Sequence, residues 1–193
     1  MDPLHLRWQT TFLEVIQQAE CAGSLKDAAI AQKLSAWTTL LTKAVVTSFR
    51  ELGFEAAAKG HRLEAFPIRR NEYLSLDVIA FSANASAWTF PVAIAELENS
   101  KQDHQVAYSL WKVLCVHADL RIVFCYRQDP EACSDLVRFL RREVVLAMKM
   151  EERTSLTGET VVVVGTRGAA ETFPYGFFKW WMLEKNTSTF NLI

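Results

Sequence analysis

The sequence predicts a single α/β domain, and three observations favour this fold class. Short apolar runs rich in Val, Ile and Phe are bounded by polar residues and Pro, which is typical of strands; they cover residues 73–81, 91–98 and 120–126. A segment with helical spacing, residues 102–117, lies between the second and third runs. Half of the residues are hydrophobic, which is typical of a packed globular protein, and a length of 193 residues suffices for one substantial core but is short for two domains.

Helices are predicted before these strands. Apolar residues repeat at helical spacing over residues 4–19, which indicates an amphipathic helix. We expect residues 21–24 to break it, with Ser24 and Asp27 resembling a capping pair for a second helix. A third helix is predicted over residues 37–52, and Gly53 is suited to end it.

Residues 54–72 fit either one strand with a bulge or two short strands around a Gly turn, with Pro67 at an edge or a strand end. Beyond the strand over residues 120–126, Asp129 and Pro130 are suited to the N-cap and first position of a helix that we expect to continue through Met150. Two further elements are predicted nearer the C-terminus.

Residues 160–165 have the pattern of a buried strand, and the aromatic-rich residues 177–183 that of a final strand or short helix. The aromatic residues there fit either the core, which we favour, or a dimer surface. No repeat, low-complexity tract or linker divides the chain. We therefore expect a helical extension over residues 1–35, a central region over 36–126, and a C-terminal helix with strands over 127–193.

Three acidic residues stand in the apolar runs. Asp77 interrupts the first run, while Glu96 and Glu98 end the second. Residues two apart on a strand project to the same face, so Glu96 and Glu98 should lie together, with Asp77 beside them if the strands pair as a hairpin. Such a cluster is costly to desolvate and is usually kept at a wet edge or around a hard cation such as Mg²⁺. The alternative is that these acids are ordinary solvent-facing residues.

The order helix, strand, strand, strand, helix, strand, with an Asp in one strand and Glu-x-Glu in the next, resembles the PD-(D/E)xK nuclease superfamily over residues 36–126. The resemblance implies a three-layer restriction-endonuclease-like core, in which helices flank a mixed central sheet. It also implies hydrolysis of phosphodiester bonds in DNA or RNA by Asp77, Glu96 and Glu98, with Mg²⁺, or alternatively Mn²⁺, held by Asp77 and Glu96.

The chain departs from the superfamily pattern at two positions. No Pro precedes Asp77, and Glu98 stands where the motif usually has Lys. Glu98 would then act as a base or a metal ligand, and Lys101 and Lys112 are candidates for a displaced lysine. The same substitution also occurs in superfamily members that have lost activity.

Further residues are candidates for binding the substrate. Some superfamily members carry a Gln and a Tyr in the helix after the motif, and Gln105 and Tyr108 approximate that pattern with a spacing one residue short. Lys101 is a further candidate in the same region. Arg69 and Arg70 are also candidates, because the guanidinium group suits phosphate, although we favour a solvated turn for these two residues.

Charge and motifs leave a second function open. The net charge of −1 counts against a large nucleic-acid footprint, because such footprints depend on Lys and Arg. Together with Glu98, it favours a catalytically inactive nuclease-fold protein that acts as a binding or assembly subunit, with a protein partner or as a homodimer. A nucleotide-binding enzyme is disfavoured because no GxxxxGK or GxGxxG run is present. With no signal peptide or membrane-length apolar run, we expect a cytoplasmic protein without membrane contact.

Overall fold

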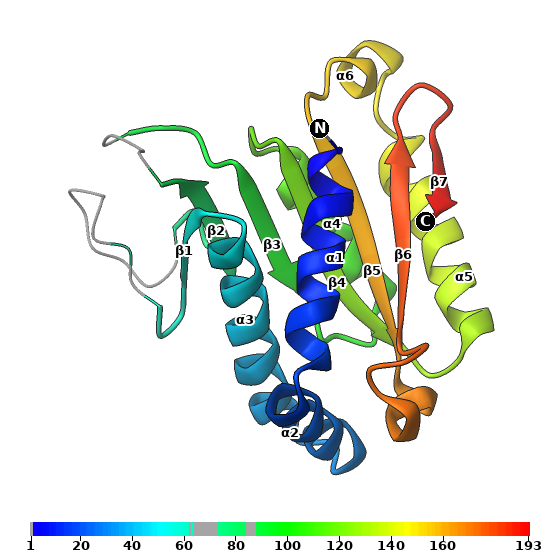
Figure 1. Ribbon diagram of the computed structural model, residues 1–193. Coiled ribbons are helices and arrows are strands. Elements are labelled where there is room, and N and C mark those ends of the chain that lie inside the picture. Colours follow the sequence, from blue (N-terminus) through cyan, green and yellow to red (C-terminus); the bar gives the residue numbers. More distant parts are fainter. Residues whose placement is uncertain (1, 62, 64–72, 84–87) are drawn as a thin grey trace.

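The computed structural model describes residues 2–61, 63, 73–83 and 88–193. Within these residues, a seven-stranded mixed sheet has its strands side by side in chain order (Figure 1). The middle strands β3, β4 and β5 are parallel, whereas every other neighbouring pair is antiparallel. The strands are β1 (Phe54–Ala58), β2 (Val78–Ser82), β3 (Ala93–Leu97), β4 (Leu120–Arg127), β5 (Glu159–Thr166), β6 (Phe178–Glu184) and β7 (Thr189–Leu192).

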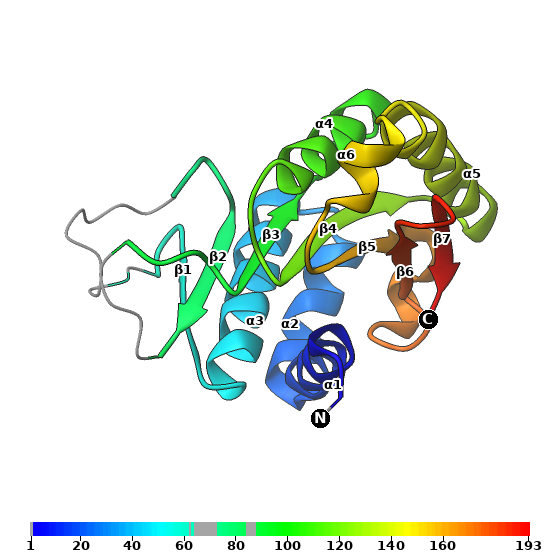
Figure 2. The ribbon, with the colours of Figure 1, turned by 90° about the horizontal axis from the view of Figure 1, so that it is seen from above.

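Helices cover both faces of the sheet, so the protein has three layers (Figure 2). One face carries α1 (Leu4–Gln17), α2 (Ala19–Ile30) and α3 (Leu34–Glu51). The other face carries α4 (Asp103–Leu114) and α5 (Pro130–Leu140). Shorter helical segments are the π-helix η1 (Arg141–Val145), α6 (Met150–Thr154) and the 3₁₀-helix η2 (Arg167–Thr172). The predicted α/β class, and the mixed sheet flanked by helices, are confirmed.

An aromatic cluster fills the layer between the sheet and α1. Strand residues that face this side alternate with residues that face α4 and α5, because successive side chains of a strand point to opposite faces of the sheet. The ring contacts join Trp8, Phe12, Phe49, Phe124, Phe178 and Trp180. Because β6 supplies two of these rings, its aromatic residues belong to the core, which is the favoured of the two expectations for residues 177–183.

A buried hydrogen bond links α1 to α3 within this cluster. Trp8 Nε1 donates to Ser48 Oγ at 3.0 Å, and Ser48 Oγ in turn donates to the Val45 carbonyl. We expect Ser48→Ala to lower the free energy of unfolding by about 1–3 kcal/mol, because the indole N–H would remain buried without an acceptor. Urea unfolding measures this, with Ser134→Ala on the exposed side of α5 as control. An unchanged midpoint for Ser48→Ala would contradict it.

The predicted break at residues 21–24 is wrong. The turn occurs earlier, at Gln18, whose extended backbone (φ −57°, ψ 131°) separates α1 from α2. Residues 21–24 then continue within α2, because Leu25 and Ala28 are buried against the core and keep the helical stripe facing inward. Ser24 and Asp27 are therefore interior helical residues and not a capping pair.

Other boundaries also differ from the sequence-based expectation. The Asp129 side chain does accept a hydrogen bond from the Ala132 N–H at 2.8 Å, which confirms it as the N-cap of α5. The helix does not continue to Met150, since the turn widens over η1, where Val144 and Val145 are both buried. Residues 54–58 form one strand, and a Gly60 turn with a bridge from Ala58 to His61 follows. Pro67 lies outside the described residues.

Candidate functional site

Asp77 and Glu96 meet where β2 begins and β3 ends. β2 starts at Val78, one residue after Asp77, so the predicted strand over residues 73–81 is shorter than expected. The antiparallel register pairs Val78 with Ala95 and thereby sets Asp77 beside Glu96. The Asp77 N–H lies 3.3 Å from Glu96 Oε1, and the Leu97 N–H donates to Asp77 Oδ2 at 2.7 Å. The two strands do pair antiparallel, which was the condition for Asp77 to lie beside Glu96, and this pairing brings the two carboxylates together.

Glu96 is a nearly buried carboxyl group with a lysine partner. Only 5% of its surface is exposed, and Lys112 Nζ from α4 lies 2.6 Å from Glu96 Oε2. Lys112 also donates to the Ser75 carbonyl at 2.9 Å, which holds its ammonium group in place. Burial raises the pKa of Glu96 to about 7, the Lys112 hydrogen bond opposes this rise, and the charge of Asp77 adds to it. Glu96 therefore changes protonation near neutral pH.

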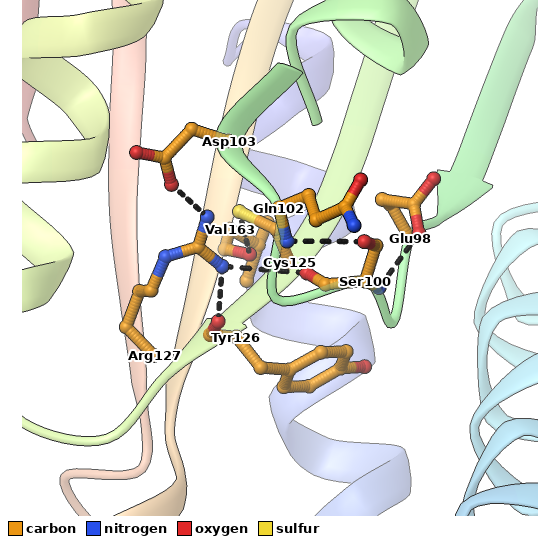
Figure 3. Close-up of polar contacts among 8 residues, drawn as sticks. All are labelled: Glu98, Ser100, Gln102, Asp103, Cys125, Tyr126, Arg127 and Val163. Carbon is orange, nitrogen blue, oxygen red and sulfur yellow. Dashed lines mark hydrogen bonds and ion pairs between the residues drawn. The ribbon is translucent and has the colours of Figure 1, made fainter. Parts of the chain in front are cut away.

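Glu98 follows β3 and projects to the same side as Glu96, as the strand alternation predicted. Its Oε1 accepts from the Ser100 N–H at 2.7 Å (Figure 3). Its Oε2 accepts from Ser109 Oγ of α4 at 3.2 Å. Both oxygens are thus bonded within the protein. Among the described residues, no group of three or more His, Cys, Asp and Glu side chains has the arrangement of a metal site.

Loop 98–102, which carries Glu98 away from β3, is held by Arg127 at the end of β4 (Figure 3). The guanidinium forms an ion pair with Asp103 and donates to the carbonyls of Tyr126, at 2.5 Å, and Ser100, at 3.5 Å. From the other face, Asn99 Nδ2 donates to Thr38 Oγ1 at 2.9 Å. Sequence reasoning missed these residues, although an Arg that ends a long buried strand was a usable signal.

Three of the candidate substrate residues lie within the described structure: Lys101 in loop 98–102, and Gln105 and Tyr108 on α4. Gln105 shares one face of α4 with Ser109 and Lys112, since the three residues are spaced four and three apart. Tyr108 is exposed on α4, and its ring centroid lies 6.0 Å from that of Trp111. Lys101 lines a separate pocket, and no ion pair joins it to Asp77, Glu96 or Glu98 within the described residues. Arg69 and Arg70 lie outside the described residues.

The two carboxylates at the strand ends are a donor set that suits a hard cation. Mg²⁺ is commonly held by one or two carboxylates, with waters and substrate oxygens completing its shell. Asp77 and Glu96 meet that requirement in chemistry and adjacency. Of the two lysines considered as displaced motif residues, Lys112 is the one that contacts a carboxylate of this pair.

Comparisons with protein-family models, curated proteins and solved structures found no match to this chain. The class that the fold itself defines is a three-layer α/β protein with a seven-stranded mixed sheet. In the described part of the chain, no helix combines the length and the apolar character needed to cross a membrane.

Proposed function

We propose that this protein is a metal-dependent nuclease of the PD-(D/E)xK type, hydrolysing phosphodiester bonds in DNA or RNA. The observation that carries the proposal is the convergence of Asp77, Glu96 and Lys112 at the adjoining ends of β2 and β3. The order α3, β1, β2, β3, α4, β4 supports a restriction-endonuclease-like core, because it repeats the order on which the sequence resemblance rests.

Each residue has a defined task in this proposal. Asp77 and Glu96 hold Mg²⁺ or Mn²⁺, which when bound offsets charge on the phosphate and lowers the pKa of a bound water. Lys112 takes the part of the motif lysine: from α4 its ammonium group neutralises a phosphate oxygen beside the two carboxylates. Glu98 lies on the same side and accepts the proton of the attacking water through the oxygen that Ser109 now contacts.

Two observations favour a second candidate, a catalytically inactive subunit of the same fold. Lys112 already satisfies the buried charge of Glu96, and both oxygens of Glu98 have partners within the protein. Such an arrangement is stable without a metal. The exposed rings of Tyr108 and Trp111 would then belong to a contact surface for a protein partner.

A cleavage assay combined with calorimetry separates the two candidates. The nuclease proposal expects Mg²⁺ and Mn²⁺ to bind, and at least one of single-stranded, duplex or branched DNA, or RNA, to be cut only with metal present. We expect Lys112→Met to lower the rate of cleavage about a hundredfold, as loss of one preorganised positive donor does elsewhere. Lys26→Met on α2 is the matched control. Absence of both metal binding and cleavage in the wild type would leave the subunit as the function.

A further inference from the structure

A pocket of about 290 Å³ lies beside loop 98–102, on the face of the sheet covered by α2 and α3. It is formed by the end of α2, the start of α3, and the segments that follow β3, β4 and β5. Ala28, Ile30 and Leu34 form an apolar wall, whereas Lys101 and Arg167 contribute cations. Asp77, Glu96 and Glu98 do not line it. The pocket is therefore distinct from the proposed metal site.

The guanidinium of Arg167 lies against the ring of Tyr126. Its guanidinium carbon lies 5.2 Å from the centroid of the Tyr126 ring, and its NH2 group makes one long contact, 3.5 Å, with the Asn99 carbonyl. The Tyr126 ring is itself fixed, since its hydroxyl accepts from Trp37 Nε1 at 2.9 Å. Most of the five guanidinium donors of Arg167 thus have no bond within the described structure.

Within the described residues, neither cation of the pocket, Lys101 or Arg167, forms an ion pair with an acidic side chain. Glu171 also lines the pocket, and its side chain is exposed. The lining thus has two positive charges and one negative charge next to an apolar wall, an arrangement that suits an anion with an apolar or aromatic body.

The backbone around Arg167 is preformed. The Gly168 N–H donates to the Gln128 carbonyl at 2.8 Å, which ties the segment after β5 to the segment after β4. A Cβ atom at Gly168 would lie only 2.7 Å from that carbonyl oxygen, so the close approach requires glycine. Arg167 therefore projects from a fixed backbone, which lowers the entropic cost of binding a ligand.

We propose that this pocket binds a phosphomonoester, with its phosphate between Arg167 and Lys101 and its organic body against Ala28, Ile30 and Leu34. A phosphomonoester carries about two negative charges at neutral pH, which matches the two cations, and its oxygens suit the fork of a guanidinium. The volume admits a ligand of mononucleotide size. Glu171 on the lining disfavours a further anionic group, so a monophosphate binds better than a triphosphate.

Calorimetry in metal-free buffer tests this site separately from the nuclease proposal. The probes are adenosine monophosphate, adenosine triphosphate, adenosine, and a tetranucleotide with and without a 5′-phosphate. We expect adenosine monophosphate or the phosphorylated tetranucleotide to bind, and adenosine and the unphosphorylated tetranucleotide not to bind. Lys101→Gln and Arg167→Gln should each weaken binding about tenfold or more, whereas Arg138→Gln, an exposed arginine of α5, should not.

Comparison of the probes also identifies the source of the phosphate. Binding of adenosine monophosphate alone indicates a free small molecule, and tighter binding of the phosphorylated tetranucleotide indicates the end of a nucleic-acid strand. Lys101 is exposed, and no hydrogen bond or ion pair of its side chain occurs within the described residues, so we expect Lys101→Gln to preserve the fold even if Arg167→Gln does not. Failure of every phosphate-bearing probe to bind, or wild-type affinity in Lys101→Gln, overturns the proposal.

Discussion

Asp77→Asn is expected to lower metal-dependent phosphodiester cleavage about a thousandfold while leaving the fold intact. Asparagine has the shape of aspartate, and its side-chain oxygen can still accept the hydrogen bond from the Leu97 N–H. The substitution nevertheless removes one of the two negative charges that would hold the cation. A metal contributes several kcal/mol to charge stabilisation in the transition state, and each 1.36 kcal/mol corresponds to a factor of ten in rate.

Single-turnover cleavage with saturating Mg²⁺ gives the rate, and calorimetry with Mg²⁺ gives the affinity of the same variant. Both quantities should fall together in Asp77→Asn. The matched control is Asp135→Asn, because Asp135 is an exposed residue of α5 whose partner is Arg138. Cleavage by Asp77→Asn at the wild-type rate would contradict the metal-binding task assigned to Asp77, even if the wild-type protein is a nuclease.

The pairing of Asp77 with Glu96 was predictable because it depends on local rules. Alternation along a strand determines that Glu96 and Glu98 share a face, and the antiparallel pairing of neighbouring strands brings Asp77 beside Glu96. The helix N-cap at Asp129 was predictable for the same reason, since side chain and backbone partner are three residues apart. Features that depend only on residues close in sequence, or on neighbouring strands, can thus be predicted from the sequence.

The remaining parts of the site depend on contacts between distant segments. Lys112 reaches Glu96 only because α4 packs across β3 in one particular register. Arg127 bonds to loop 98–102 because β4 runs parallel to β3 and ends beside that loop. The pocket around Arg167 combines five segments of the chain. Periodicity gives no information on such docking, and the break at Gln18 escaped prediction because Gln carries no turn signal.

Glu96 should make the protein less stable as the pH rises from about 4.5 to about 7. Burial raises the pKa of this carboxyl in the folded state, so the folded protein retains the proton that the unfolded chain has already released. The contribution of Glu96 to stability is therefore complete below the unfolded pKa, falls through this window and is level above it. The difference is on the order of 3 kcal/mol, because one pKa unit corresponds to 1.36 kcal/mol.

Urea unfolding at pH 5 and pH 8 measures this effect in the wild type and in Glu96→Gln. The amide cannot ionise, so the variant should lose less stability between the two pH values than the wild type does. Glu143→Gln, at an exposed carboxylate paired with Arg142, controls for general charge effects. Equal pH dependence in Glu96→Gln and in the wild type would show that Glu96 titrates at its ordinary value.

The same experiment with metal connects this stability cost to function. A cation bound to Asp77 and Glu96 favours the ionised carboxyl group. Mg²⁺ should therefore raise the free energy of unfolding of the wild-type protein at pH 8 and have much less effect at pH 5. Glu96→Gln should show little stabilisation by Mg²⁺ at either pH. If the metal stabilises neither protein, the buried charge of Glu96 serves its pair with Lys112 alone, and the inactive subunit becomes the better account of the fold.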